Sequence, residues 1–285
     1  MAFEPVKETG GTLFVVATPL GNLDDLTFRA VKCLKEVHLI ACEDTRRTAK
    51  LLNHLGIKKP LISCFEHNEL ARIDELLGKI VAGEDVALVS DAGTPTISDP
   101  GFALVRAAHE RGIRVSPVPG PSALIAALSV SGLPTDEFLF AGFLPRTSGA
   151  RRARLERLKS QTATLILYES PHRVLESLKD MIDILGDRSA FLAREVTKLH
   201  EEVKRGPLSE IVMILGARSE VLGEIVLVVA GAAEGASKSG SMDEALVRFD
   251  AEVQMGATPR QAAKEAALAT GLPARDVYAS AAARK

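Results

Sequence analysis

Short apolar runs alternate with amphipathic segments through the first part of the chain. Each run is followed by polar and glycine-rich positions, and then by a segment with apolar residues every three or four positions, the spacing of a helix on a sheet. Continuous apolar strands are typical of parallel sheets that are buried on both faces. The pattern predicts an α/β fold with mostly parallel sheets. The expected strands are residues 13–17, 39–42, 61–64, 86–89 and 115–118, and the expected helices are residues 26–34, 48–55, 70–81, 102–111 and 123–131.

A second group of elements begins near residue 135. Strands are expected at 138–140, 164–168, 190–193 and 224–229, with helices at 151–160, 173–185 and 207–216. Three further helical patterns, at 243–254, 259–269 and 273–283, predict a small tail. It is either a helix-turn-helix bundle or an appendage that packs in a dimer. The expected parts are an N-terminal α/β domain (1–132), a second α/β domain (133–234), a Gly/Ser-rich linker (235–241) and a helical tail (242–285).

Composition narrows the class of protein. A chain of 285 residues with 46% hydrophobic and 25% charged residues is expected to fold into more than one domain. The formal net charge of −2 gives no global attraction to nucleic acid, so any such surface must be local. Cys33, Cys42 and Cys64 form no CxxC pair, which favours reduced thiols over a zinc site or a disulfide framework. With no leader-like or membrane-length apolar run, we expect a cytoplasmic protein without membrane or metal partners.

Residues 86–101 are the clearest candidate ligand loop. An apolar strand at 86–89 runs into hydroxyl groups and two aspartates, held between Gly93 and Gly101. In open α/β sheets, ligands bind at the carboxyl ends of the strands, and glycines allow the backbone to approach them closely. An ordinary turn rich in Gly, Pro and Asp is the alternative.

Other loops also follow predicted strands. The chain has neither a GxGxxG after its first strand nor a GxxxxGK[ST] sequence, so the usual dinucleotide and P-loop motifs are absent. The loops are expected to line a cleft between the two domains. They comprise residues 18–22, 43–46, 90–101, 119–123, 169–173 and 194–202.

In their order along the chain, these six segments resemble the signature segments of the ribosomal RNA small subunit methyltransferase I group of the tetrapyrrole methylase superfamily. The likeness covers about residues 12–232, and the tail is similar to the helix-turn-helix extension of this group. The resemblance implies two α/β domains with S-adenosylmethionine in the cleft between them. It also implies a homodimer that methylates a ribose 2′-hydroxyl of 16S rRNA in the 30S subunit, at cytidine 1402.

The resemblance also implies which residues contact the cofactor. Members of the superfamily usually carry Gly-Asp-Pro where this chain has Gly93-Thr94-Pro95, so a direct aspartate contact there is in doubt and Asp91 is the expected substitute. The implied contacts are Pro19, Asp91, Gly93, Thr94, Ile97, Ser122, Ala123, Glu169, Val196 and Thr197.

Methyl transfer to a ribose hydroxyl requires in-line alignment and benefits from a base. Lys198 would serve as a base if burial lowered its pKa, or would otherwise bind phosphate. An ordinary salt bridge beside the cleft is the alternative for each candidate. The candidates are Glu43, Asp44, Glu195, Lys198, His200 and Glu201.

A basic run gives the chain a candidate RNA surface. Between residues 146 and 159, Glu156 is the single acid among several arginines. Such local density suits phosphate contacts, although a solvated helix face is the alternative. Arg173 follows a proline at an expected helix start, where it either meets phosphate or caps the helix. The proposed RNA contacts are Arg146, Arg151, Arg152, Arg154 and Arg173.

Two other functions compete with RNA methylation. A methyltransferase acting on a small tetrapyrrole would share the cleft but lack the basic run and the tail. A ribosome-binding factor without enzymatic activity would not need the cofactor loops. Aromatic residues make up 4% of the chain, which argues against extensive base stacking and favours recognition of RNA shape and backbone.

Overall fold

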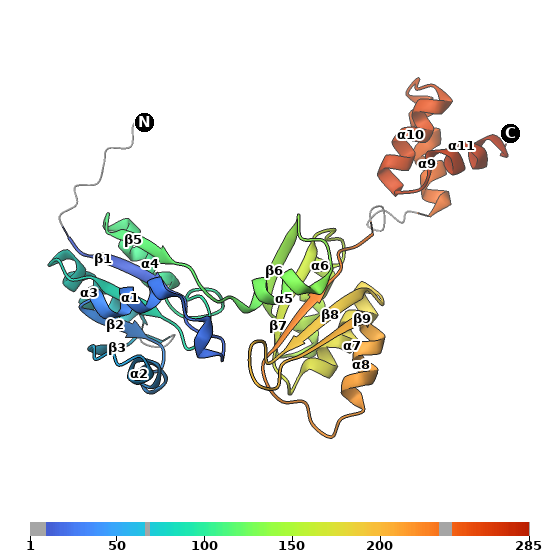
Figure 1. The fold of residues 1–285 in the computed structure, drawn as a ribbon. Helices are drawn as coiled ribbons and strands as arrows, with labels where there is room; N and C mark the ends of the chain where they lie inside the picture. The colour runs from blue at the N-terminus through green and yellow to red at the C-terminus, as the bar shows by residue number, and fades with distance from the viewer. Residues whose placement is uncertain (1–9, 66–68, 234–240, 285) are drawn as a thin grey trace.

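The computed structural model describes residues 10–65, 69–233 and 241–284, and within them two five-stranded sheets lie next to each other (Figure 1). The first sheet has the strand order β3-β2-β4-β1-β5, and its neighbouring strands run parallel. This confirms the parallel sheet expected for the first part of the chain. Its strands are β1 (Thr12–Val16), β2 (Leu39–Cys42), β3 (Leu61–Ser63), β4 (Val86–Val89) and β5 (Arg114–Val118).

Helices cover both faces of the first sheet because its strands are apolar on both sides. In β4, Ala87 and Val89 pack toward α1 and α2, while Val86 and Leu88 pack toward α3 and α4. Burial on two faces explains why the strand reads as a continuous apolar run. The helices are α1 (Phe28–Glu36), α2 (Thr45–His54), α3 (Glu69–Val81) and α4 (Phe102–Glu110), and the short 3-10 helix η1 (Leu23–Asp25) precedes α1.

The second sheet differs from the expected parallel arrangement. Its order is β6-β7-β10-β8-β9, and β6 and β7 run parallel, but β10 is antiparallel to both of its neighbours and β9 is antiparallel to β8. The direct return from β8 to β9 has no crossover helix, which only an antiparallel pair permits. The strands are β6 (Phe138–Phe143), β7 (Thr164–Glu169), β8 (Ser189–Arg194), β9 (Glu202–Pro207) and β10 (Ile225–Val229).

The position of α5 (Ala123–Ser131) corrects the expected domain boundary at residue 132. Its buried Leu124 and Leu128 pack with Ile166 and Val228 of the second sheet, not with the first. By packing, the second unit therefore begins before α5. The opposite face of this sheet is covered by α6 (Ser148–Leu158), α7 (Val174–Leu185) and α8 (Leu208–Gly216).

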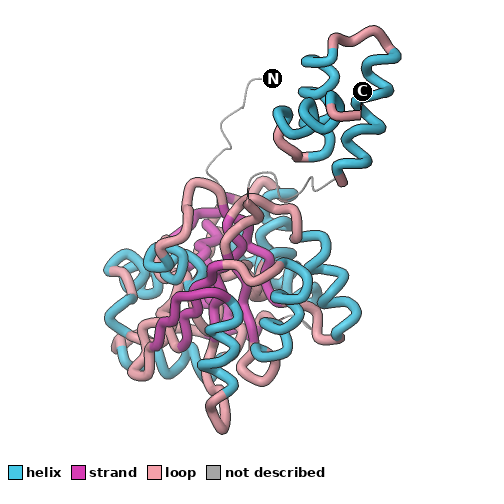
Figure 2. Tube along the Cα trace, turned by 90° about the vertical axis from the view of Figure 1, so that its right-hand side faces the viewer, coloured by secondary structure: helices cyan, strands magenta, loops and turns pink. Residues whose placement is uncertain are grey.

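A cluster of three helices forms the described part of the tail, within residues 241–284 (Figure 2). Ala245, Ala263 and Val277 are buried where the helices meet. Thr258 begins the middle helix with a capping box that includes Gln261, and Pro259 occupies its first turn. Residues 235–240 of the expected linker lie outside the described residues. The helices are α9 (Met242–Gln254), α10 (Pro259–Thr270) and α11 (Ala274–Ala282).

Candidate active site

A cavity of about 480 Å³, here called the large cavity, opens between the two sheets. Loops that follow β2 and β4 contribute from the first sheet, and the ends of β7 and β10 contribute from the second. Ser122 and Ala123, at the start of α5, lie where the chain passes from one sheet to the other. Neither unit forms this cavity alone, so a ligand in it would bind both.

The loop after β4 is held firmly at the mouth of the large cavity. The backbones of Thr18 and Gly93 exchange hydrogen bonds of 2.8 and 3.0 Å, which join the loops after β1 and β4. Gly93 has a φ of 81°, and a Cβ there would lie 3.3 Å from Cδ2 of Leu20. Thr96 and Ser98 also have positive φ, a strained conformation that clusters at ligand sites. The loop geometry is thus fixed before any ligand arrives.

The structure brings most of the expected cofactor residues to the large cavity, but not all of them. Pro19 lines a neighbouring cavity, while Val196 and Thr197 lie in the segment after β8 and line neither. Thr197 has a φ of 65°, and its buried Oγ1 has no hydrogen-bond partner among the described residues. The residues that do line the large cavity are Asp91, Gly93, Thr94, Ile97, Ser122, Ala123 and Glu169.

Two of these lining residues already have their polar atoms paired. The Thr94 hydroxyl donates to the carbonyl of Pro121 at 3.1 Å. The buried Glu169 carboxylate accepts hydrogen bonds from the Ser177 hydroxyl at 2.5 Å and the Ser170 amide at 2.7 Å. Arg173 also pairs with Glu169 at 2.9 Å, so its guanidinium is used within the fold rather than open to phosphate. Thr94 and Glu169 therefore shape the cavity more than they present free polar groups to it.

Carboxylates give the large cavity an acidic lining. Burial raises the pKa of Asp99 to about 6, helped by the charges of Glu43 and Asp91. Burial and the charge of Asp91 likewise raise the pKa of Glu43. Sequence reasoning did not single out Asp99, although it is the second aspartate of the ligand loop. An excess of acids around a cavity favours a cationic ligand.

Asp44 was a candidate for the general base, but its surroundings do not suit that role. It caps α2 by accepting from the Arg46 amide at 2.8 Å, and it pairs with the Arg46 guanidinium at 2.9 Å. The side-chain hydrogen bond from Arg46 lowers the pKa of Asp44 to about 2. Of the candidate bases named from the sequence, Glu43 is the one that lines the large cavity.

Lys198 and Glu195 form a bridge beside the large cavity. The Lys198 ammonium lies 2.9 Å from Glu195 and 3.2 Å from Glu224. Burial lowers the pKa of Lys198, but these two carboxylates outweigh it and hold the pKa above its ordinary value. Lys198 is therefore protonated near neutral pH, which argues against its role as a base. His200 and Glu201 are exposed, and the Glu201 carboxylate accepts from the Thr197 amide at 2.6 Å.

The stem of Lys198 also packs against Gly21. A Cβ on Gly21 would lie 2.3 Å from Cγ of Lys198, so only glycine leaves room for this side chain. Gly21 follows β1 of the first sheet, and Lys198 follows β8 of the second. The lysine thus links the two units next to the large cavity.

Two of the four arginines on α6, Arg151 and Arg152, are paired with acids of α7. Arg151 is 3% exposed and contacts Asp180 of α7 at 2.6 Å, while Arg152 contacts Asp180 at 2.6 Å and Asp183 at 3.0 Å. The expectation that Arg151 meets phosphate is therefore corrected, because its guanidinium lies inside the fold. Arg146 is exposed and Arg154 half-buried, and within the described residues neither forms an ion pair.

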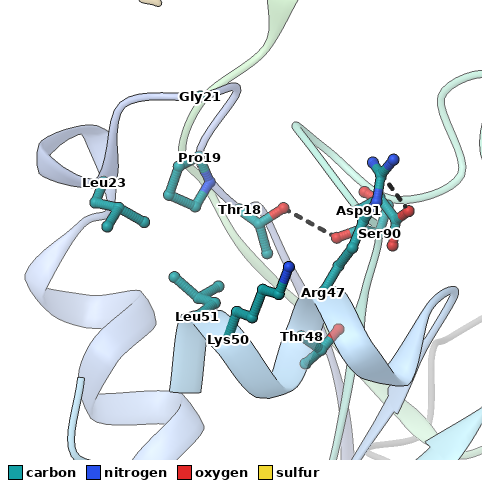
Figure 3. A pocket seen from close by; sticks show the side chains of 10 residues that line it. All are labelled: Thr18, Pro19, Gly21, Leu23, Arg47, Thr48, Lys50, Leu51, Ser90 and Asp91. Carbon is teal, nitrogen blue, oxygen red and sulfur yellow. Dashed lines mark hydrogen bonds and ion pairs between the residues drawn. The ribbon is translucent and has the colours of Figure 1, made fainter. Parts of the chain in front are cut away.

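A second cavity of about 230 Å³, here called the small cavity, lies between the loop after β1 and the side of α2 (Figure 3). Arg47 and Asp91 line both cavities, and they form an ion pair at 3.3 Å. Lys50 extends from α2 toward the Thr18–Pro19 loop. Arg47 and Lys50 were missed from sequence, although both are cations in the helix that follows the Glu43-Asp44-Thr45-Arg46 segment.

Three further features bear on the chemistry available. Cys33, Cys42 and Cys64 are free and buried. Within residues 10–65, 69–233 and 241–284, no group of three or more His, Cys, Asp or Glu side chains is placed to hold a metal ion. In the same residues, no helix has both the length and the apolar character needed to cross a bilayer.

Known proteins resemble this chain along almost its full length. The sequence model of the family described as Tetrapyrrole (Corrin/Porphyrin) Methylases matches residues 12–212. Ribosomal RNA small subunit methyltransferase I of Pseudomonas aeruginosa is 49% identical over 97% of this chain and 99% of its own. The protein of the same name from Thermotoga maritima is 51% identical, and the alignment covers 78% of this chain and 99% of its own.

Solved structures share the fold at low sequence identity. Diphthine synthase superimposes with a TM-score of 0.57 at 16% identity, covering 77% of this chain and 90% of its own. Uroporphyrin-III-C-methyltransferase from Thermus thermophilus gives a TM-score of 0.54 at 20% identity, and the superposition covers 77% of this chain and 94% of its own. These likenesses establish the architecture of the two sheets.

Proposed function

We propose, from the premise that this chain belongs to the tetrapyrrole methylase family, that it methylates the ribose 2′-hydroxyl of cytidine 1402 in 16S rRNA. Membership of this family implies a methyl donor, which we propose to be S-adenosylmethionine. The observation that carries the proposal is the 49% identity to a relative named for rRNA methylation, across 97% of the chain. We also propose that the enzyme acts in the cytoplasm as a homodimer on the 30S subunit, as the family likeness implies.

The large cavity suits S-adenosylmethionine in size and in chemistry. Its volume of about 480 Å³ lies within the range of about 300–1,000 Å³ usual for sites of small ligands. Ile97 and Ala123 offer apolar contact for adenine, and the loop around Gly93 allows close backbone approach. The acidic lining favours the positive sulfonium. When bound there, the cofactor supplies an electrophilic methyl group.

The chain's own residues must then align the acceptor and take its proton. Glu43 lines the large cavity beside Arg47, and its pKa lies above the ordinary value because of burial and the charge of Asp91. A carboxylate with a raised pKa is a better base at neutral pH. We assign Glu43 to accept the proton of the ribose hydroxyl as its oxygen gains the methyl group. Lys198, held by Glu195 and Glu224, keeps the two units in register around the reacting groups.

The test is a transfer assay with methyl-tritiated S-adenosylmethionine and two acceptors. Unmethylated 30S subunits are expected to become labelled, and a uroporphyrinogen-type tetrapyrrole is not. Label on the tetrapyrrole alone would favour the small-molecule methyltransferase. Absence of both label and cofactor binding by calorimetry would favour a ribosome-binding factor without enzymatic activity.

A further inference from the structure

The small cavity has a different chemical character from the large cavity beside it. The large cavity faces the carboxylates of Glu43 and Asp99, whereas the small cavity is lined by the cation Lys50 and not by these acids. Arg47 and Asp91 stand at the boundary between the two. A substrate that reaches both cavities would meet an acidic lining in one and exposed cations in the other.

The two cations of the small cavity lie on one side of α2. Lys50 comes three residues after Arg47, a spacing that places both side chains on the same helix face. Lys50 is exposed, and no ion pair joins it to any described residue. The Arg47 side chain is 65% exposed and that of Asp91 is 20% exposed, so the guanidinium still has an open side that another anion can approach. Both cations are therefore available to a ligand.

Three apolar side chains also line the small cavity, together with the hydroxyl residues Thr18, Thr48 and Ser90. Leu51 projects from α2, and Pro19 and Leu23 come from the loop that precedes α1 (Figure 3). Leu23 is 43% exposed, so part of its apolar surface is open to a ligand in the small cavity. A sugar ring and the face of a base present matching apolar surface, and a phosphate next to them would reach the cations.

We propose that the small cavity binds one nucleotide of the RNA substrate, the neighbour of the nucleotide that is methylated. Its phosphodiester lies against Lys50 and Arg47, and its sugar and base lie against Leu23 and Leu51. The volume of about 230 Å³ is below the range of about 300–1,000 Å³ usual for a site that encloses a whole small ligand, as expected for a site that holds one unit of a longer strand. This inference rests on the proposed function, since it assigns the acceptor strand to a place beside the cofactor.

The experiment measures kcat, the KM for 30S subunits and the Kd for S-adenosylmethionine in variants of Lys50. Lys50→Glu is expected to raise KM about tenfold or more, the effect of losing one charge-assisted hydrogen bond. Lys50→Arg should keep KM near the wild-type value, since it preserves the charge. The Kd for S-adenosylmethionine should stay within about twofold in both variants, because Lys50 does not line the large cavity.

Lys35→Glu is the matched control. Lys35 is an exposed lysine in the last turn of α1, and it lines neither the large nor the small cavity. Lys35→Glu makes the same change in net charge as Lys50→Glu, so a general electrostatic effect on RNA binding would appear in both variants. A similar rise in KM for Lys35→Glu would overturn the assignment, as would an unchanged KM for Lys50→Glu.

Two further outcomes separate this inference from the proposed function. If the wild type transfers no methyl group, the proposed function fails, and direct binding of 30S subunits by wild type and Lys50→Glu still tests the small cavity. Cytidine monophosphate is the probe for a free nucleotide as the ligand. If it binds the wild type tightly and Lys50→Glu weakly, while 30S binding is the same for both, the cavity serves a small molecule instead of RNA.

Discussion

Arg151 and Arg152 of α6 and Lys50 of α2 are all cations on helices, but they have opposite surroundings. On α6, Arg151 pairs with Asp180 inside the fold, and the more exposed Arg152 pairs with Asp180 and Asp183, so acids of the neighbouring helix balance both charges. Beside α2, Lys50 forms no ion pair with a described acid, and of the carboxylates that line the large cavity, Glu43 and Asp99 form no ion pair with a described cation. Balanced charge here supports the architecture, while unbalanced charge lies where a ligand is expected.

The pKa shifts of the two regions follow this difference. Burial alone would raise the pKa of Asp180, but hydrogen bonds from Arg151 and Arg152 hold it below its ordinary value. Burial raises the pKa of Asp99 to about 6, and the neighbouring acids add to the rise. A carboxylate with a lowered pKa is already satisfied, whereas one with a raised pKa gains from a cationic ligand.

The largest expected effect is the loss of stability in Arg151→Met. Removing this buried cation takes away one of the two arginines that contact the Asp180 carboxylate at 2.6 Å, and breaking such a buried pair typically costs about 3–5 kcal/mol. Urea unfolding followed by circular dichroism measures the change. Arg154→Met on the same helix is the control, with an expected change below about 0.5 kcal/mol because Arg154 has no ion pair among the described residues. Equal loss from the two variants would refute the structural role of Arg151.

The next largest effect concerns the ligand loop. Gly93→Val puts a branched side chain where φ is 81° and Leu20 lies 3.3 Å from the new Cβ, so we expect at least about a tenfold weaker affinity for S-adenosylmethionine. Isothermal titration calorimetry measures the affinity of the variant for S-adenosylmethionine. Gly83→Val is the matched control, since Gly83 also has positive φ, at 100°, but no described heavy atom lies within 4 Å of its Cβ position. Gly83→Val should lower stability without weakening the cofactor's binding, and wild-type affinity in Gly93→Val would remove the loop from the site.

Lys198 distinguishes a base from a charged bridge. Because Glu195 and Glu224 hold its pKa above the ordinary value, Lys198→Arg should retain most of the methyl transfer, whereas Lys198→Ala should lose about tenfold or less. A true base would lose about 100-fold in both variants. The measurement is the steady-state kcat of the wild type, Lys198→Arg and Lys198→Ala. If Lys198→Arg were as inactive as Lys198→Ala, the result would show that Lys198 is the base.

The smallest effect is a pH dependence of cofactor affinity. The pKa of Asp99 is raised to about 6, so its carboxylate loses its charge as the pH falls through that value. A cationic ligand binds better to the ionised form, and the affinity for S-adenosylmethionine should fall about threefold to tenfold from pH 7 to pH 5. In Asp99→Asn this part of the pH dependence should disappear. A steep dependence that persists in Asp99→Asn would assign it to another group.

The local pattern of apolar and polar residues was enough to predict most of the helices and strands. The ends of the predicted strands and helices differ from those observed by no more than three residues. The exception is β9, whose sequence Glu-Val-Lys-Arg-Gly-Pro has little apolar character because it forms the exposed edge of the second sheet. The direction of β10 was also out of reach, since the same apolar run suits a parallel or an antiparallel neighbour.

The site was predictable only where its residues are close in sequence. The ligand loop after β4 combines glycines, hydroxyls and acids in one segment, so it is visible without the structure. The partner of Arg151 lies 29 residues away in Asp180, and one partner of Lys198 lies 26 residues away in Glu224. Such pairings depend on how the helices and sheets pack, and they decide which charges are free.

The chemical identity of the methylated nucleoside decides whether this chain is a ribose methyltransferase that acts on 16S rRNA. Unmethylated 30S subunits are incubated with the enzyme and S-adenosylmethionine, the 16S rRNA is digested to nucleosides, and the products are analysed by mass spectrometry. We expect a new methyl group on the ribose of a cytidine, mapped by reverse transcription at limiting nucleotide to position 1402. A methyl group on a base, or RNA that stays unmodified while the cofactor binds, would contradict it.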